Sequence, residues 1–306
     1  MKSERTHKFR YIVFVLLVIG CIVCLLPLVS HGTPPTQAEQ LGLSNRLTIL
    51  TWNTHQMGQY RKPHENAVLQ YLLAQDADVI CLQEVDVYKS AEFLTLAEVK
   101  QALGAKYPYS YIDFSVYNKR RQFGNMVWSR YPLINKKTVD YEIRANLSSR
   151  CDVLKGEDTI RLIVNHLESN RFSASDLVHV GSDTDYEDLR HSAQRLSSKW
   201  NTASARRHEQ ARAVRQEIDN SPHPVVVVGD LNDVALSYTY YTISKGLHDA
   251  WLETSWGKWG STFDLKGSFG VRIDYIFCQD PIIPIQCAVK KTTGSDHSPV
   301  VAELAW

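Results

Sequence analysis

The stretch VVVVGDLND, residues 225–233, joins four β-branched apolar residues directly to glycine, carboxylate and amide side chains. Valine favours extended structure, and an uninterrupted apolar run of this kind predicts a strand that is buried on both faces. Asp230 and Asn232 follow the run at once. A rigid buried strand holds a reactive carboxylate in fixed geometry, so the stretch predicts a polar site at the end of a strand.

Other strands are predicted from apolar or alternating runs along the chain. They lie at RLTILTWN (46–53), DVICLQE (78–84), YSYIDF (109–114), GNMVWS (124–129), DTIRLIVNH (158–166), PVVVVGD (224–230), RIDYIFC (272–278) and SPVVAEL (298–304). Helices are predicted at 65–75, at about 185–219, and at 91–104, where Phe93, Leu96, Val99 and Leu103 share one face and Gly104 ends the helix. The loose alternation of strands and helices, without a repeat, predicts one α/β domain with helices covering the sheets.

The N-terminal segment is typical of a membrane anchor. Residues 1–10 carry four basic side chains and one acidic side chain, and residues 11–29 carry neither. These 19 uncharged residues, at about 1.5 Å each in a helix, nearly match a bilayer core of roughly 30 Å. We therefore predict that the basic flank stays in the cytoplasm and that the chain after residue 30 lies outside it, in the periplasm if the source is bacterial.

The anchor has two alternatives, and both shape the predicted domain organisation. A cleaved signal peptide normally has a shorter apolar region and a small-residue cleavage site, which is absent here. VIGC (18–21) resembles a lipobox with a lipidated Cys21, but the chain stays apolar for eight residues after this cysteine. We favour an uncleaved single-pass anchor. The chain then divides into a basic flank (1–10), an anchor (11–29), a linker (30–45) and one folded domain (46–306).

Composition and charge exclude some classes of protein. The chain has 306 residues and is 44% hydrophobic, so it can bury a sizeable core. Beyond the first ten residues, 30 of its 34 basic and 32 of its 33 acidic side chains remain, a net charge near −2. This domain lacks the broad basic surface of proteins that hold long nucleic acids through phosphates. Cys278 and Cys287 could pair in an oxidising compartment, but we leave them unpaired.

Polar side chains stand at the ends of several predicted strands that lie far apart in the sequence. Because strand ends of one α/β sheet meet at a common edge, these side chains are expected to form one cluster at the rim of the fold. They are Asn53, Glu84, His166, Asp230, Asn232, Asp296 and His297.

Around these residues the chain resembles the endonuclease/exonuclease/phosphatase family, which includes pancreatic-type deoxyribonuclease, abasic-site endonucleases, inositol polyphosphate 5-phosphatases and neutral sphingomyelinases. The resemblance covers about residues 46–306 and follows the family's order: TWN, LQE, GNMVWSRYPL, NHLE, GDLND, RIDYIF and SDHSPV. Each motif alone is a weak signal, but all of them in order form a strong one. The resemblance implies a four-layered α/β sandwich and a metal-dependent phosphoesterase that hydrolyses a phosphodiester or phosphomonoester by metal-activated water.

The resemblance also implies a metal site built from Asn53, Glu84 and Asp296. Glu84 is expected to bind Mg²⁺ (or Mn²⁺), since Mg²⁺ prefers oxygen ligands and needs only one or two protein carboxylates. Asn53 would orient Glu84 or complete the metal shell. Asp296 would lie at the metal or brace the rim.

The implied catalytic residues are His166, Asp230, Asn232, Asp274 and His297. Asp230 would take a proton from the attacking water or align it, and Asn232 would hold that water or a phosphate oxygen. His297 would form an acid/base pair with Asp274, and His166 would donate to a non-bridging phosphate oxygen. Whether Asp230 or His297 takes the proton of the water is left open.

Several features narrow the predicted substrate. His55 stands where abasic-site enzymes carry a second carboxylate, and the His-Leu pair at 166–167 resembles sphingomyelinases and general phosphodiesterases. The arginine-rich stretch 168–219 is predicted to form a solvated helical face, with a substrate lid as the alternative. YNKRRQFGN (117–125) is a second candidate substrate loop.

The predicted partners are a phosphate-ester substrate (nucleic acid, nucleotide or lipid headgroup) and the membrane, without a protein partner. An inactive, membrane-tethered binding or scaffold module is the alternative function.

Overall fold

The computed structural model describes residues 42–55, 57, 64–141, 146–170, 186–255, 258, 260–264 and 270–306, with the backbone alone for 186–189. The predicted anchor, residues 11–29, lies outside these ranges, as does most of the linker. Within the described residues, no helix is both long enough and apolar enough to cross a membrane.

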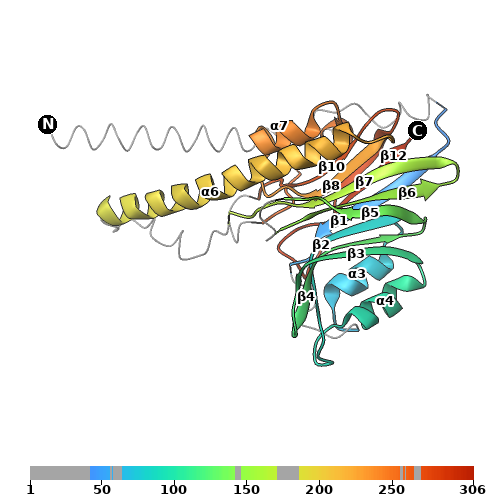
Figure 1. Ribbon diagram of the computed structural model, residues 1–306, viewed down its shortest axis with the longest axis horizontal. Coiled ribbons are helices and arrows are strands. Elements are labelled where there is room, and N and C mark those ends of the chain that lie inside the picture. Colours follow the sequence, from blue (N-terminus) through green and yellow to red (C-terminus); the bar gives the residue numbers. More distant parts are fainter. Residues whose placement is uncertain are drawn as a thin grey trace.

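Two six-stranded mixed sheets form the centre of the fold (Figure 1). The first has the order β11 (Ile283–Val289), β12 (Val300–Ala305), β1 (Arg46–Asn53), β2 (Val79–Tyr88), β4 (Arg121–Ser129) and β3 (Tyr109–Tyr117). The second has the order β5 (Leu133–Thr138), β6 (Ser148–Lys155), β7 (Asp158–His166), β8 (Val225–Asp230), β10 (Asp274–Cys278) and β9 (His248–Asp249). The pairs β1–β2 and β7–β8 are parallel, and the other neighbouring strands are antiparallel.

Helices cover the outer face of each sheet (Figure 1). Helices α3 (Ala67–Ala74) and α4 (Leu96–Gly104) lie on the first sheet, and α6 (Tyr186–Asp219) and α7 (Tyr238–Ser244) lie on the second. A short helix, α8 (Ala250–Thr254), packs beside β11. The prediction of two packed sheets flanked by helices is therefore confirmed.

The valine run of β8 shows why the sheets pack in this way. Val226 and Val228 point into the core between the two sheets, whereas Val225 and Val227 point into the core under α6 and α7. None of the four is more than 1% exposed. Because both faces of β8 are covered, the strand needs apolar residues at every position and not at every second one.

The start of α4 and the end of β2 differ from the sequence prediction. Helix α4 begins at Leu96 and not at residue 91, because Thr95 and Glu98 form a capping box that starts the helix there. Phe93 lies before the helix and packs against the ring of Tyr88. Strand β2 does not end at Glu84 but continues to Tyr88 after a register shift between Leu82 and Val85.

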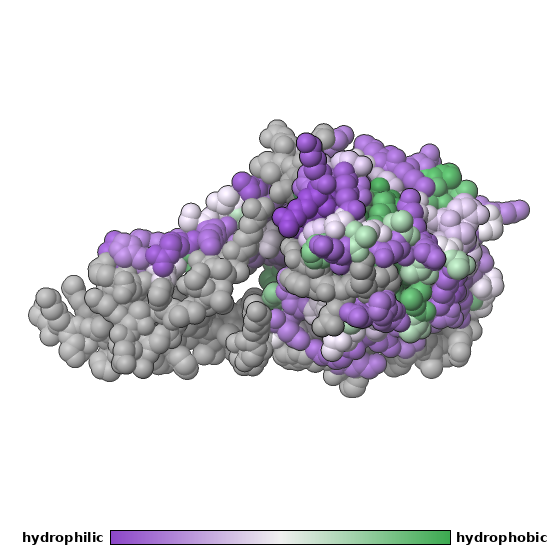
Figure 2. All heavy atoms as spheres, turned by 90° about the horizontal axis from the view of Figure 1, so that it is seen from below, coloured by the Kyte–Doolittle hydropathy of each residue, from purple (hydrophilic) through white to green (hydrophobic). Residues whose placement is uncertain are grey.

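Residues 186–219 of the arginine-rich stretch form the long helix α6, and residues 171–185 of the stretch lie outside the described residues. The outer part of α6 extends beyond the sheets (Figure 1) and is hydrophilic on the face seen in Figure 2. The inner part packs on the second sheet through Ala211, Val214 and Ile218. The predicted solvated face therefore describes the outer part of α6 but not the inner part. Cys278 and Cys287 are both buried free thiols.

Candidate active site

Three neighbouring strands of the second sheet bring polar side chains to the same rim. Asp230, at the end of β8, pairs in register with His166 at the end of β7 and with Asp274 at the start of β10. The first sheet adds Asn53 from the end of β1 and Glu84 from β2. The structure therefore brings these five predicted residues together.

Asn53 links the two sheets at the centre of this cluster. Its Nδ2 donates to Oδ2 of Asp230 at 2.9 Å and to Oε1 of Glu84 at 3.1 Å. Asn53 is 1% exposed, so its amide has little access to water. A buried amide that bridges two carboxylates fixes the position of both, and this arrangement is the one expected if Asn53 orients Glu84.

Asn232 holds Asp230 from the other side. Its backbone N–H donates to Oδ1 of Asp230 at 2.7 Å, and its Nδ2 donates to Oδ2 at 3.1 Å. Asn232 has a φ of 50°, a left-handed conformation that asparagine tolerates better than most residues. This conformation turns both donors of one residue toward the same carboxylate.

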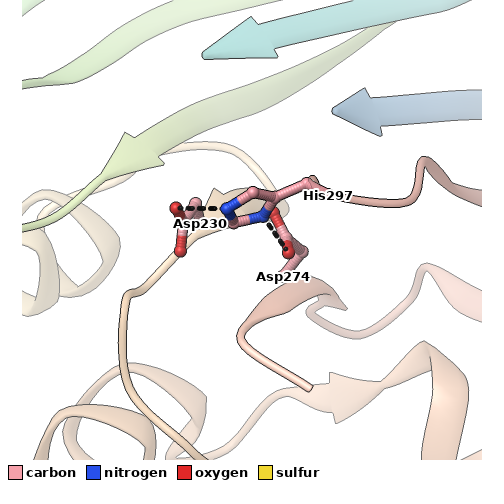
Figure 3. Close-up of side chains that lie close together, drawn as sticks. All are labelled: Asp230, Asp274 and His297. Atoms are coloured by element: carbon pink, nitrogen blue, oxygen red, sulfur yellow. Dashed lines mark hydrogen bonds and ion pairs between the residues drawn. The ribbon is translucent and has the colours of Figure 1, made fainter. Parts of the chain in front are cut away.

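His297 lies between two buried carboxylates (Figure 3). Its Nδ1 is 2.8 Å from Oδ2 of Asp274, and its Nε2 is 3.8 Å from Oδ2 of Asp230. Burial alone would lower the pKa of His297, but the charges on Asp274 and Asp230 outweigh burial and raise this pKa to about 10. Burial, together with the charge on Asp274, raises the pKa of Asp230. The imidazole is therefore a cation at neutral pH.

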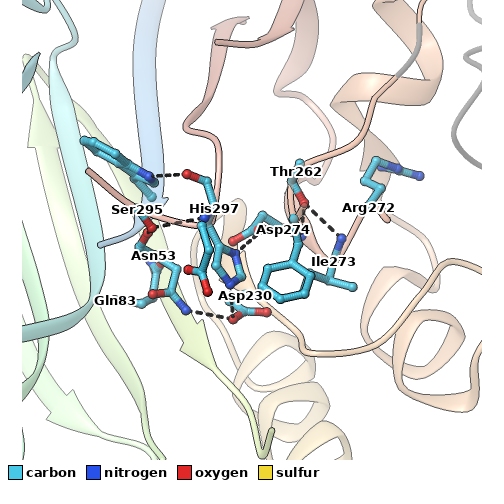
Figure 4. A network of polar contacts seen from close by, with 12 residues as sticks. Asn53, Gln83, Asp230, Thr262, Arg272, Ile273, Asp274, Ser295 and His297 are labelled. Carbon is cyan, nitrogen blue, oxygen red and sulfur yellow. Dashed lines mark hydrogen bonds and ion pairs between the residues drawn. The ribbon is translucent and has the colours of Figure 1, made fainter. Parts of the chain in front are cut away.

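Further side chains fix the backbone and ring of His297 (Figure 4). Ser295 Oγ accepts from the N–H of His297 at 3.0 Å and donates to the carbonyl of Asn53 at 2.8 Å. The indole N–H of Trp52 donates to the carbonyl of His297. The ring of Phe263 packs against the imidazole, with 4.8 Å between the two ring centroids. Ser295 and Trp52 stand within the SDHSPV and TWN motifs, so the motifs themselves pointed to them.

Glu84 faces His166 across the rim. Its Oε1 lies 3.2 Å from Nε2 of His166, and its side chain is 21% exposed. Burial opposes ionisation of Glu84. Hydrogen bonds from His166 and Asn53, together with the charge of His166, outweigh burial and lower the pKa of Glu84 to about 2. Burial lowers the pKa of His166, and Glu84 reverses this effect and raises it. Asn146, which no motif predicted, places its Nδ2 3.2 Å from Nε2 of His166.

His55 and Asp296 form a more exposed pair at the same rim. Nδ1 of His55 lies 3.3 Å from Oδ1 of Asp296, with side chains 49% and 36% exposed. The backbone N–H of His55 donates to Oδ1 of Asn53 at 3.1 Å. The histidine that departs from the abasic-site pattern is therefore part of the polar cluster.

The side chains at the rim fit a divalent cation with oxygen ligands. Glu84 is ionised and keeps some access to solvent, and Oδ1 of Asp296, although its side chain is partly exposed, is a buried atom that has the ion pair with His55 but no hydrogen bond among the described residues. Among the described residues, Asp230, Asp274 and His297 also have ligand atoms within 4.8 Å of one another. Both nitrogens of His297 already face carboxylates there, so this second group is better explained as an acid/base relay.

Comparisons with known proteins agree with this geometry. Residues 50–297 match the Endonuclease/Exonuclease/phosphatase family. No curated protein matches the chain significantly.

Solved structures are similar over most of the chain. A humanised D. rerio TDP2 is 18% identical, with 85% of this chain and 99% of that chain covered and a TM-score of 0.58. Sphingomyelinase C from Streptomyces griseocarneus is 17% identical, with 85% and 99% covered and a TM-score of 0.56. An endonuclease/exonuclease/phosphatase from Beutenbergia cavernae DSM 12333 is 20% identical, with 86% and 72% covered and a TM-score of 0.58.

At these identities the solved structures support the fold alone, whereas the family match covers most of the sequence. The chain belongs to the endonuclease/exonuclease/phosphatase family, whose members are metal-dependent phosphoester hydrolases.

Proposed function

We propose that this protein hydrolyses a phosphodiester or phosphomonoester with water as the nucleophile and Mg²⁺ or Mn²⁺ as cofactor, while anchored in a membrane with its catalytic domain outside the cytoplasm. The observation that carries the proposal is the relay Asp274–His297–Asp230, which lies beside the Asn53–Glu84 pair at one rim. The relay supplies the acid/base groups, and Glu84 supplies an ionised oxygen ligand for the metal.

Asp230 is a better candidate than His297 for the group that accepts the proton of the attacking water. Burial raises its pKa, so it is a stronger base than an ordinary carboxylate, and three hydrogen bonds from Asn53 and Asn232 hold it in place. His297 is a cation, because Asp274 and Asp230 raise its pKa. The imidazolium can therefore donate to a phosphate oxygen or to the leaving group.

Glu84, with Asn53 and Asp296, would hold the metal. A bound divalent cation would supply positive charge against the charge that develops on the phosphate oxygens. His166 lies 3.2 Å from Glu84, and the hydrogen bond and charge of Glu84 raise the pKa of His166. His166 can donate a hydrogen bond to an anionic phosphate at this position.

Two substrate classes are supported by the similar structures. One of them, D. rerio TDP2, is in complex with a single-strand DNA product, and another is a sphingomyelinase C. We therefore propose a phosphate ester of nucleic acid, a nucleotide or a lipid headgroup. The uncharged segment 11–29 supports a substrate that is met at the outer face of a membrane.

A substrate panel tests this proposal. The full chain in detergent is assayed with Mg²⁺ or Mn²⁺, and with a chelator, on plasmid DNA, RNA, inositol phosphates and sphingomyelin vesicles. We expect turnover of one class that the chelator abolishes. His297→Ala should reduce this turnover by about 100-fold or more, whereas His248→Ala should not, since His248 pairs with Glu253 and Asp280 and not with the relay.

The outcomes separate the substrate classes. Cleavage of nucleic acid should weaken steeply as salt rises, while hydrolysis of a lipid headgroup should depend on the vesicle surface and little on salt. Turnover that survives both the chelator and His297→Ala would contradict the proposal.

A further inference from the structure

Arg207 is a fully buried cation that the proposed chemistry does not use. It lies on α6 and is 0% exposed. Its Nη1 donates to the carbonyl of Glu168 and to Oδ1 of Asn170, each at 2.9 Å, and its Nε donates to Oδ2 of Asp233 at 3.2 Å. One guanidinium therefore joins two loops, the loop after β7 and the loop after β8.

Gln210 completes this contact from the same face of α6. Its Oε1 accepts from the backbone N–H of Glu168 at 2.8 Å. Residues three apart in a helix are neighbours on its surface, so Arg207 and Gln210 reach Glu168 together. Arg206 adds a contact to the carboxylate of Glu168 at 3.0 Å. Both main-chain polar groups of this 2% exposed residue are thus bound by side chains of α6.

The segment held in this way sets the position of Asn232. The carbonyl of Leu167, the residue before Glu168, accepts from Nδ2 of Asn232 at 3.0 Å and from Nδ2 of Asn146 at 2.7 Å. The N–H of Leu167 donates to the carbonyl of Asp230 at 3.0 Å. A shift of the Leu167 carbonyl would therefore turn the Asn232 amide away from Asp230.

The loop after β8 is held from its other side by the same guanidinium. Asp233 directly follows Asn232, is 4% exposed, and has its carbonyl bound by the hydroxyl of Tyr275 at 3.1 Å. Asn232 keeps a left-handed backbone between Asp230 and Asp233. Such a conformation persists where the surroundings determine it, which here includes the Arg207–Asp233 ion pair.

We propose that Arg207, together with Gln210, is a positioning residue for phosphoester hydrolysis. It fixes the separation of the loops at 167–170 and 231–235, so that the Asn232 amide is aimed at the reacting group beside Asp230. This inference rests on the proposed function of Asp230 and Asn232. Arg207 does not touch the reacting atoms and acts only through the two loops.

Arg207→Lys tests this role while keeping the positive charge. A lysine ammonium cannot reproduce the planar fork that binds Asp233 and the Glu168 carbonyl together. We expect kcat to fall about tenfold or more with KM changed less than about threefold, because misplacement affects the transition state more than substrate binding. Gln210→Met should act in the same direction. Arg215 lies on the same helix and donates to Asp219 and to the backbone carbonyls of residues 243 and 245. Arg215→Lys should therefore leave kcat unchanged.

A double-mutant cycle separates positioning from a general loss of structure. If Arg207 acts through Asn232, then Arg207→Lys should change kcat less than about twofold in an Asn232→Ala background. Thermal unfolding of each variant in detergent confirms that the full chain is folded. An unchanged kcat in Arg207→Lys, or the same fold-loss in both backgrounds, would overturn the inference.

The failure of this inference can be told apart from failure of the proposed function. A wild-type chain without turnover would contradict the function, and hydrogen exchange then decides the positioning claim. Arg207→Lys should speed amide exchange at 164–170 and 229–235 but not in α4. Unchanged exchange at both loops would overturn the role of Arg207.

Discussion

At the scale of single residues, the charge state of His297 is set by its two carboxylate neighbours. Asp274, at 2.8 Å, is the closer of the two. Asp274→Asn removes one charge that opposes the effect of burial, so the pKa of His297 should fall from about 10 toward its ordinary value of 6.5. NMR titration of the imidazole in the metal-free chain measures this change.

His248 provides the internal control for that titration. Its pKa is raised by Asp280 and Glu253 against the effect of burial, and it lies outside the relay. Its titration should be the same in both chains. A His297 that titrates identically with and without the Asp274 carboxylate would contradict the relay.

Glu84 makes a separate prediction about metal binding. Glu84→Gln keeps the shape of the side chain but removes the charge that a hard cation requires. Affinity for Mn²⁺, measured by isothermal titration calorimetry of the full chain, should weaken by about tenfold or more. Glu253→Gln is the matched control, since Glu253 contacts His248. Equal affinity in Glu84→Gln and wild type would remove Glu84 from the metal site.

Each predicted site residue stands in one of the sequence motifs. Most of these residues lie at a strand end or in the loop beside one, whereas Glu84 lies within β2 at its register shift. Asn146 was not predicted because it stands in no such motif. Its contact with His166 joins chain segments that meet only in the folded molecule. The positioning role of Arg207 was not predicted for a related reason. Arg207 is one of several arginines in residues 186–219, and its burial in the folded protein distinguishes it from the solvated ones.

At the scale of elements, Gly229 is the residue that lets β8 approach β7. Its φ is 116°, and a Cβ there would lie 2.1 Å from the carbonyl oxygen of Asn165. Gly229→Ala should therefore cost about 3 kcal/mol or more in the free energy of unfolding, since both backbone strain and a clash in a packed sheet are added. Urea unfolding measures this cost.

Gly104→Ala is the matched control for this substitution. A Cβ at Gly104 meets no atom within 4 Å, so the change should leave stability the same or slightly higher. Similar unfolding free energies for the two variants would show that the β7–β8 contact is not as tight as described.

The elements that were predicted correctly are those with strong local patterns. Strands β1 and β7 match their predicted bounds, and the apolar residues of both strands are all buried. Strands β5, β6 and β11 were not predicted from the sequence. β5 and β11 are edge strands, and the residues of β5 after Leu133 are exposed, so pairing with a neighbour fixes these two strands and leaves little trace in hydrophobic periodicity. β6 lies inside the second sheet, but polar residues interrupt its apolar ones in SSRCDVLK.

At the scale of the whole molecule, the segment 11–29 makes a prediction about topology. A chain produced in a bacterial host should stay in the membrane fraction after a carbonate wash, and protease added outside spheroplasts should degrade residues 46–306. Cys21→Ala tests the lipobox alternative, and the anchor predicts unchanged retention. A wild-type chain that washes off the membrane, or a domain protected from external protease, would contradict the proposed location.

Hydrolysis of a generic phosphodiester tests the central claim most directly. The full chain in detergent is incubated with bis(p-nitrophenyl) phosphate and Mg²⁺ or Mn²⁺, beside a chelated sample and an Asp230→Asn variant. We predict metal-dependent release of p-nitrophenol that the chelator abolishes and that Asp230→Asn lowers by about 100-fold or more. Release that continues in the chelator, or that Asp230→Asn leaves intact, would contradict metal-dependent hydrolysis at this site.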